Sequence, residues 1–182
     1  VIAMFDACSE AFGPIDGFVN NAGVVAPSLP LAEMTLERMA RVFDINVTGA
    51  FLCAREAARR MPLSRGGRGG AIVNISSIAA RLGSPNEYVD YAASKAAVDT
   101  MTIGLAKELA ADGVRVNAVR PGLTETDIHA SGGEPDRARR LGVTTPMGRP
   151  GTPEEIAGLA TWLLGEEAAY VTGAVMDVSG GR

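Results

Sequence analysis

Apolar residues along this chain recur first at helical and then at strand-like spacing, and the alternation repeats to the end. Helical spacing is expected over residues 1–12, 35–61, 87–110 and from 153 onward, and strand spacing over residues 15–19, 71–76, 114–119 and 174–177. The strand segments are short and rich in β-branched residues, which is typical of buried strands. The order therefore predicts an α/β fold, a three-layer, doubly wound parallel sheet with helices on both faces.

Local signals set the ends of several elements. Gly13-Pro14 ends the first helix, and Thr152-Pro153-Glu154-Glu155 predicts a helix start with Thr152 as N-cap and Glu155 closing a capping box. Residues 123–151 are polar and are predicted to be a mobile loop with one short helix. No linker or repeat divides the chain, so a single domain is expected.

Composition and charge exclude several classes of function. The chain of 182 residues is 47% hydrophobic and 21% charged, which is typical of a globular domain. Its net charge is -4 and its Lys/Arg residues form no basic stripe, so we expect no nucleic-acid partner. Without a bilayer-length apolar run or a secretory signal, we expect no membrane partner and a cytoplasmic protein. The chain has one histidine, His129, and two cysteines, Cys8 and Cys53, which are expected to be buried free thiols. We therefore expect no metal site.

Three short polar or turn-forming segments follow three of the predicted strands. They are Asn20–Gly23, Ser76–Ser77 and Pro121–Gly122. In open α/β sheets, ligands bind at the carboxyl ends of the strands, so this edge is predicted to form a small-molecule site.

Tyr91 and Lys95 stand four residues apart on a predicted helix and so share one face. A neighbouring ammonium favours the phenolate and lowers the pKa of a tyrosine, which makes the phenol a usable acid/base. A serine at the end of the preceding strand is positioned to hold a substrate oxygen beside it. The pair by itself also fits an exposed helical pair without function.

Six ordered segments together resemble the classical short-chain dehydrogenase/reductase family. The matching pieces are Asn20-Asn21-Ala22-Gly23, Asn46, Ile72 to Ser77, Tyr91-x-x-x-Lys95, Arg120-Pro121-Gly122 with Thr126, and Asp177 to Gly181. The resemblance covers the whole chain. It implies a Rossmann-like fold, NAD or NADP as cofactor, a small alcohol or carbonyl substrate, and a homodimer or homotetramer.

The resemblance also implies a role for individual residues. Tyr91 would be the general acid/base, Lys95 would lower the pKa of Tyr91 and hold the nicotinamide ribose, Ser77 would position the substrate oxygen, and Asn46 would help to hold a water in the proton path. The remaining cofactor-binding residues would be Asn20, Ala22 and Gly23 on the adenosine-ribose side, and Pro121, Gly122, Thr124 and Thr126 beside the nicotinamide.

Each assignment has an alternative. Ser76 and Ser77 fit strand-end or cap serines, Asn20-Asn21 fits a turn, and Asn46 fits an exposed helical asparagine. Ser77 is preferred to Ser76 because it lies fourteen residues before Tyr91, one more than the usual family spacing, and Ser76 is further away.

A second tyrosine raises a different chemistry. Tyr88 lies seven residues before Lys95, the spacing of enoyl reductases of the same superfamily, which reduce a carbon–carbon double bond. Tyr91, four residues before the lysine, favours alcohol/carbonyl chemistry instead.

One departure from the family pattern concerns the beginning of the chain. No glycine-rich phosphate loop precedes Asn20, and at about 30 residues per βαβ unit roughly 60–70 residues are expected to be missing. Residues 1–182 are therefore expected to be the C-terminal portion of an NAD(P)-binding Rossmann-fold domain. The rival hypothesis is a non-catalytic, cofactor-deficient remnant that only forms oligomers through its two long helices.

Overall fold

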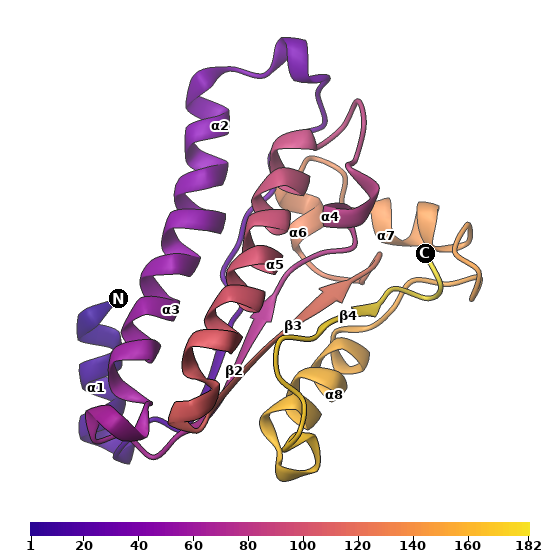
Figure 1. The fold of residues 1–182 in the computed structure, drawn as a ribbon. Coiled ribbons are helices and arrows are strands. Elements are labelled where there is room, and N and C mark those ends of the chain that lie inside the picture. Colours follow the sequence, from indigo (N-terminus) through magenta and orange to yellow (C-terminus); the bar gives the residue numbers. More distant parts are fainter.

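Four parallel strands form the centre of the molecule in the order β1-β2-β3-β4 (Figure 1). The computed structural model describes all of residues 1–182. The strands are β1 Gly17–Asn20, β2 Gly70–Ile75, β3 Val114–Pro121 and β4 Val175–Val178. In the register, Asn20 stands opposite Asn74, and Asn74 stands opposite Ala118. All three pairings are parallel, so the α/β class predicted from the sequence is confirmed.

Helices cover both faces of this sheet. They are α1 Ile2–Phe12, α2 Leu36–Phe43, α3 Ala50–Arg60, α4 Ala79–Leu82, α5 Val89–Leu109, α6 Ile128–Ser131, α7 Arg137–Gly142 and α8 Pro153–Leu164. The long helices α3 and α5 run side by side on one face, and α8 lies on the other (Figure 1). None of the helices combines the length and the apolar character needed to cross a membrane.

The central strands bury side chains on both faces, as parallel strands between helices do. Ile72 packs with Met61, which directly follows α3, and with Leu109 of α5 in one cluster. The next residue, Val73, points to the opposite face and packs with Leu163 of α8 in a second cluster. This period of two explains why the strands read as continuous apolar runs.

The predicted start of α8 is confirmed in detail. The Thr152 hydroxyl accepts a hydrogen bond from the Glu155 backbone N–H at 3.4 Å, and the Glu155 carboxylate accepts one from the Thr152 N–H at 2.9 Å. Two backbone donors that the helix itself leaves unpaired are thus satisfied.

The single helix predicted over residues 35–61 differs from the structure. It is divided by a π-helical segment, Asp44–Gly49, into α2 and α3. Asn46, inside this segment, is turned inward and bonds to the backbone of Val24 rather than facing solvent. Bulges of this type recur at functional sites.

Two smaller expectations also need correction. The polar segment 123–151 holds two short helices, α6 and α7, and the short helix α4 after β2 was not predicted. Cys8 is exposed and Cys53 is half-buried, although buried thiols were expected. The reason for Cys8 is that α1 buries only Phe5, so most of its apolar residues stay at the surface.

A chain of buried amide and hydroxyl groups crosses from β1 through β2 to α5. The Asn20 amide donates to the Asn74 side-chain oxygen at 3.1 Å, and the Asn74 amide donates to the Thr102 hydroxyl at 2.9 Å. The two ends of this hydrogen-bond network donate to backbone carbonyls. Asn20 donates to the Ala50 carbonyl at 3.0 Å, and Thr102 donates to the Val98 carbonyl at 2.8 Å. The sheet and two helices are therefore joined by polar contacts inside the core.

Replacing the central member should be costly. Asn74 is completely buried, so Asn74→Val leaves an amide N–H of Asn20 without its acceptor and removes the donor to the Thr102 hydroxyl. We expect the free energy of unfolding to fall by about 2–4 kcal/mol, measured by chemical denaturation. The double variant Asn20→Val/Asn74→Val removes both partners of one bond, and its loss should be smaller than the sum of the two single losses. Additive losses would contradict the network.

Candidate active site

Tyr91 and Lys95 lie in the first turns of α5, beside the carboxyl end of β2. Lys95 is 4% exposed, and its ammonium donates a hydrogen bond to the Ile75 carbonyl at 2.8 Å. The ammonium nitrogen is 5.8 Å from the centre of the Tyr91 ring. The predicted i,i+4 pair therefore faces the strand end, and the alternative of an exposed pair does not hold.

The two serines at the end of β2 differ in their environment. The Ser76 hydroxyl is buried and donates to the Lys95 backbone carbonyl at 3.2 Å. The Ser77 hydroxyl accepts from the Ala79 N–H at 3.1 Å, which leaves its own proton free to be donated, and it interacts with the Tyr91 phenol. The structure thus brings Ser77, and not Ser76, to the phenol.

The electrostatics of the phenol differ from the expectation that Lys95 lowers its pKa. Burial raises the pKa of Tyr91, and only the interaction with Ser77 acts in the opposite direction. The Lys95 ammonium is bonded to the Ile75 carbonyl rather than to the phenol oxygen, which explains the difference. Burial also lowers the pKa of Lys95 to about 8, while the nearby Asp99 carboxylate raises it.

Asp99 belongs to a group of charges on the inner side of α5. Its Oδ2 accepts two hydrogen bonds from Arg120 of β3, at 2.8 and 3.0 Å, and its Oδ1 is buried without a partner. Arg120 also contacts Asp177 of β4 at 3.4 Å. This carboxylate lies one helical turn beyond Lys95 and favours its charged form.

Asn46 and Gly23 meet beside Lys95. A Cβ atom at Gly23 would lie 3.2 Å from the Lys95 nitrogen and 3.4 Å from the Asn46 side-chain oxygen, so this contact favours glycine. The Asn46 amide donates to the Val24 carbonyl at 2.9 Å and to the Ser94 hydroxyl at 3.1 Å. Both amide hydrogens are thus used by the protein, and the side chain fixes the loop after β1 instead of offering a donor to a water.

The β1 end also needs one correction. Asn20 is expected to lie on the adenosine-ribose side, but its side chain is buried and its amide bonds to Ala50 and Asn74, so only its backbone remains for that role. Its neighbours Ala22, which is exposed, and Gly23, which is half-buried, stay at the strand end. The alternation of a strand explains the inward turn of Asn20, because its register partner Asn74 points to the same face.

The turn after β3 gathers three of its four predicted residues. Pro121 ends the strand, and the Gly122 N–H donates to the Val178 carbonyl at 2.9 Å. A Cβ atom at Gly122 would lie 2.6 Å from the Cα of Ser179, so the two backbones can approach only without a side chain. Thr124 is buried and donates to the Gly122 carbonyl at 3.2 Å, whereas Thr126 is exposed.

Comparison with known proteins places this arrangement in a family. A family model described as enoyl-(acyl carrier protein) reductase matches residues 1–182. An uncharacterized oxidoreductase of Escherichia coli (strain K12), YgfF, is 54% identical over 182 residues, which are 100% of this chain and 74% of that protein. The chain belongs to the short-chain dehydrogenase/reductase family. The resemblance inferred from the six ordered segments is thereby confirmed.

Two further proteins are similar to this short-chain dehydrogenase/reductase over its whole length. The 3beta-hydroxysteroid dehydrogenase 1 of Eggerthella lenta is 41% identical over 187 residues, which are 100% of this chain and 68% of that protein. The crystal structure of a 3-ketoacyl-(acyl-carrier-protein) reductase from Brucella melitensis, complexed with NADH, is 31% identical with a TM-score of 0.90. That match covers 100% of this chain and 72% of the neighbour.

The second tyrosine of this family member, Tyr88, has its hydroxyl and its ring engaged by neighbouring charged side chains. Its hydroxyl donates to Glu134 at 3.0 Å, and the Arg137 guanidinium stacks 5.0 Å from its ring centre. Arg137 in turn pairs with Glu87 at 2.5 Å. Tyr88 therefore ties the segment around α7 to the start of α5.

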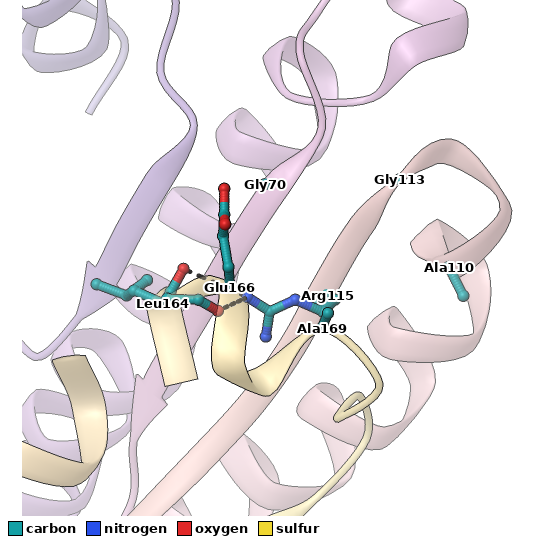
Figure 2. Close-up of a pocket in the computed structure, with 8 residues that line it drawn as sticks. Gly70, Ala110, Gly113, Arg115, Leu164, Glu166 and Ala169 are labelled. Atoms are coloured by element: carbon teal, nitrogen blue, oxygen red, sulfur yellow. Dashed lines mark hydrogen bonds between the residues drawn. The ribbon is translucent and has the colours of Figure 1, made fainter. Parts of the chain in front are cut away.

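A hollow lies at the opposite edge of the sheet, at the beginnings of the strands. It has a volume of about 670 Å³ and is lined by residues at the beginnings of β2 and β3 and the end of α8 (Figure 2). Arg115 in it donates to the carbonyls of Leu163, Leu164 and Gly165 at 2.7, 3.3 and 3.0 Å. It thus caps the C-terminus of α8. This hollow contains neither the phenol of Tyr91 nor the ammonium of Lys95.

Metal ligands do not gather anywhere in the structure. No group of three or more His, Cys, Asp or Glu side chains is arranged to hold an ion. His129 contacts the Thr124 carbonyl at 2.9 Å, and burial lowers its pKa.

The buried ammonium gives a testable dependence of stability on pH. With its pKa at about 8 instead of 10.5, Lys95 destabilises the fold fully below pH 8, and this cost disappears as the pH approaches 10.5. We therefore expect Lys95→Met to raise the free energy of unfolding near pH 7 by up to about 3 kcal/mol. The gain should fall by about half near pH 9.5. Chemical denaturation at both pH values measures it.

Lys107→Met, at an exposed position of the same helix, is the matched control and should change stability little at either pH. A gain for Lys95→Met that is the same at both pH values would show that burial does not depress the pKa of this lysine.

Proposed function

We propose that this protein is an NAD(P)-dependent oxidoreductase that interconverts an alcohol and a carbonyl, with Tyr91 as general acid/base. The observation that carries the proposal is the meeting of three groups at the strand ends. The Ser77 hydroxyl interacts with the Tyr91 phenol, and the Lys95 ammonium lies 5.8 Å from the phenol ring. The relatives named as a steroid dehydrogenase and a ketoacyl reductase support this class of reaction.

In the reductive direction, negative charge develops on the carbonyl oxygen of the substrate. The Ser77 hydroxyl donates a hydrogen bond to that oxygen, and the Tyr91 phenol donates its proton to it. The raised pKa of Tyr91 keeps the phenol protonated and ready for this step. In the oxidative direction the phenolate accepts the proton, and the Ser77 hydroxyl stabilises its charge by donating a hydrogen bond.

A nicotinamide dinucleotide bound at this edge would supply or accept the hydride. The residues fit such a group, because the Lys95 ammonium has one protein partner and two further N–H donors for ribose hydroxyls. The absence of a side chain at Gly23 leaves the ammonium uncrowded on that side, and the NADH-bound neighbour supports the same assignment. Ala22, Pro121, Thr124 and Thr126 would line the cofactor from the ends of β1 and β3. Residues 1–182 would form the C-terminal portion of the NAD(P)-binding domain.

Carbonyl reduction is favoured over reduction of a carbon–carbon double bond, although the matching family model is described as an enoyl reductase. The Tyr88 hydroxyl is engaged by Glu134, and its ring is covered by Arg137. Tyr91 is the phenol that faces Ser77. The tyrosine required for the carbonyl reaction is therefore the one that is available.

Tyr91→Phe should abolish turnover because it removes the proton that is transferred. In the whole protein, we expect kcat to fall by about 10²–10⁴-fold while the dissociation constant of NADH or NADPH changes little. Consumption of reduced nicotinamide with a panel of ketones and aldehydes measures kcat, and nicotinamide fluorescence measures binding.

Tyr170→Phe, at a fully exposed position, is the matched control and should behave as the wild type. Near-normal activity of Tyr91→Phe would refute the mechanism. A wild-type protein that binds neither NADH nor NADPH would favour the non-catalytic, oligomer-forming alternative.

We further propose that the protein forms a homodimer or homotetramer through the outer surfaces of α3 and α5. These helices expose Phe51 and Ile103, 47% and 42% respectively, and the small residues Ala93 and Gly104 of α5 are exposed as well. An exposed apolar surface over two parallel helices favours helix packing between copies.

Ile103→Asp places a charge in this surface and should convert the assembly to a smaller species. Light scattering after size-exclusion chromatography measures the mass, with Lys107→Glu on the same helix as a control for added negative charge. An unchanged mass for Ile103→Asp would contradict the proposed surface.

A further inference from the structure

A buried ion pair joins α2 to the first turn of α5, one residue before Tyr91. Arg38 Nε donates to Asp90 Oδ2 at 2.9 Å, and Arg38 Nη2 donates to Asp90 Oδ1 at 3.3 Å. The two side chains are 10% and 2% exposed. A planar guanidinium that grips both oxygens of one carboxylate fixes their relative orientation as well as their distance.

The same carboxylate acts directly on the residue that carries the phenol. Asp90 Oδ1 accepts the backbone N–H of Tyr91 at 2.9 Å. In the first turn of a helix this N–H has no partner within the helix, so Asp90 supplies one. An acidic group there also interacts favourably with the N-terminal end of the helix dipole. The ion pair and the Tyr91 backbone are therefore one connected unit.

Arg38 also fixes the loop that follows β1. Its third nitrogen, Nη1, donates to the Pro27 carbonyl. The Leu29 N–H of the same loop donates to the Glu87 carbonyl just before α5, at 3.0 Å. At its other end, the loop is held by Asn46 through Val24. One guanidinium thus links α2, this loop and the start of α5.

Stability alone does not account for such a pair. Removing two charges from water costs several kcal/mol per ion, and replacing a buried pair by apolar side chains of similar size is often neutral or stabilising. What the apolar replacement loses is the directional grip of two parallel hydrogen bonds. Position, rather than stability, is the property that this pair is suited to supply.

We propose that Arg38 and Asp90 are positioning residues: their ion pair sets the first turn of α5 and thereby the place of the Tyr91 phenol against Ser77. The inference rests on the proposed role of Tyr91. It adds that the contact acts through the helix start and the loop after β1, without either residue touching the substrate. Displacements of about 1 Å far from the chemistry reduce rates by about 10²-fold, so a loosened helix start is sufficient for a large effect.

The decisive variant is Arg38→Met/Asp90→Leu in the whole protein, which exchanges the pair for apolar side chains. We expect kcat to fall by about 10–10²-fold while the melting temperature and the dissociation constant of NADH stay close to those of the wild type. Arg38→Lys keeps the charge but not the two-pronged grip, so its kcat should be intermediate. If the double variant folds poorly, the single variants Arg38→Lys and Asp90→Asn replace it. Each should have a kcat below that of the wild type, with an unchanged dissociation constant of NADH.

Arg60→Met is the matched control, because Arg60 pairs with Glu56 of α3 and with Asp6 of α1 and bonds to neither Tyr91 nor Ser77. Its kcat should equal that of the wild type. A double variant with wild-type kcat would overturn the proposal. A loss of kcat that merely follows a loss of stability or of NADH binding would also overturn it.

A second readout does not depend on turnover. The titration of the Tyr91 phenol is obtained from the ultraviolet absorbance difference between each protein and its Tyr91→Phe version. Burial raises the pKa of this phenol and the interaction with Ser77 lowers it, so a displaced Tyr91 should titrate at a different pH from that of the wild type. An unchanged titration in the double variant would overturn the positioning role. If the wild type shows no turnover but the titration of Tyr91 still differs between the wild type and the double variant, the proposed reaction is refuted and the positioning role stands.

Discussion

Two hydrogen bonds between Lys95 and the end of β2 hold the active-site edge together. The Lys95 ammonium donates to the Ile75 carbonyl, and the Ser76 hydroxyl donates back to the Lys95 carbonyl. Because one bond uses the side chain and the other the backbone of the same residue, the rotation of α5 about its axis is fixed relative to the strand. Tyr91, one turn earlier on the same side of α5, is thereby directed toward Ser77.

This arrangement requires a charged group in a place that disfavours charge. Burial reduces the proton affinity of Lys95, and the Asp99 carboxylate, anchored by Arg120, partly compensates. The ammonium is therefore balanced between loss of hydration and a neighbouring negative charge. A lysine in such a balance responds strongly to small changes around it, which is a property that a site for proton transfer requires.

Much of this organisation could be read from the sequence, for identifiable reasons. Strand and helix periods gave the order of elements, and parallel strands put their carboxyl ends at one edge, so Ser77 and Gly122 were expected together. The spacing of Tyr91 and Lys95 is a local property of a helix and was predicted for the same reason. The capping box at Thr152 is likewise encoded within four residues.

What the sequence did not reveal depends on contacts between distant segments. The inward turn of Asn20 depends on Asn74, 54 positions away, and the partner of Asp90 lies 52 positions away in α2. The direction of the Tyr91 pKa shift depends on burial, which spacing alone does not report. An asparagine within the β-branched run of β2 and an aspartate directly before Tyr91 were the available signals, and each has meaning only once its partner is known.

The π-helical segment Asp44–Gly49 has a consequence for insertions and deletions. A turn of this type contains one residue more than an α-helical turn. Because the wide turn absorbs the additional residue, deleting one residue there would restore a regular helix while α2 and α3 kept nearly the same rotation relative to each other. The shortened segment would instead lose the wide turn that carries Asn46, and with it the hydrogen bonds from Asn46 to Val24 and Ser94. The additional residue therefore serves the position of Asn46 rather than the packing of α2 against α3.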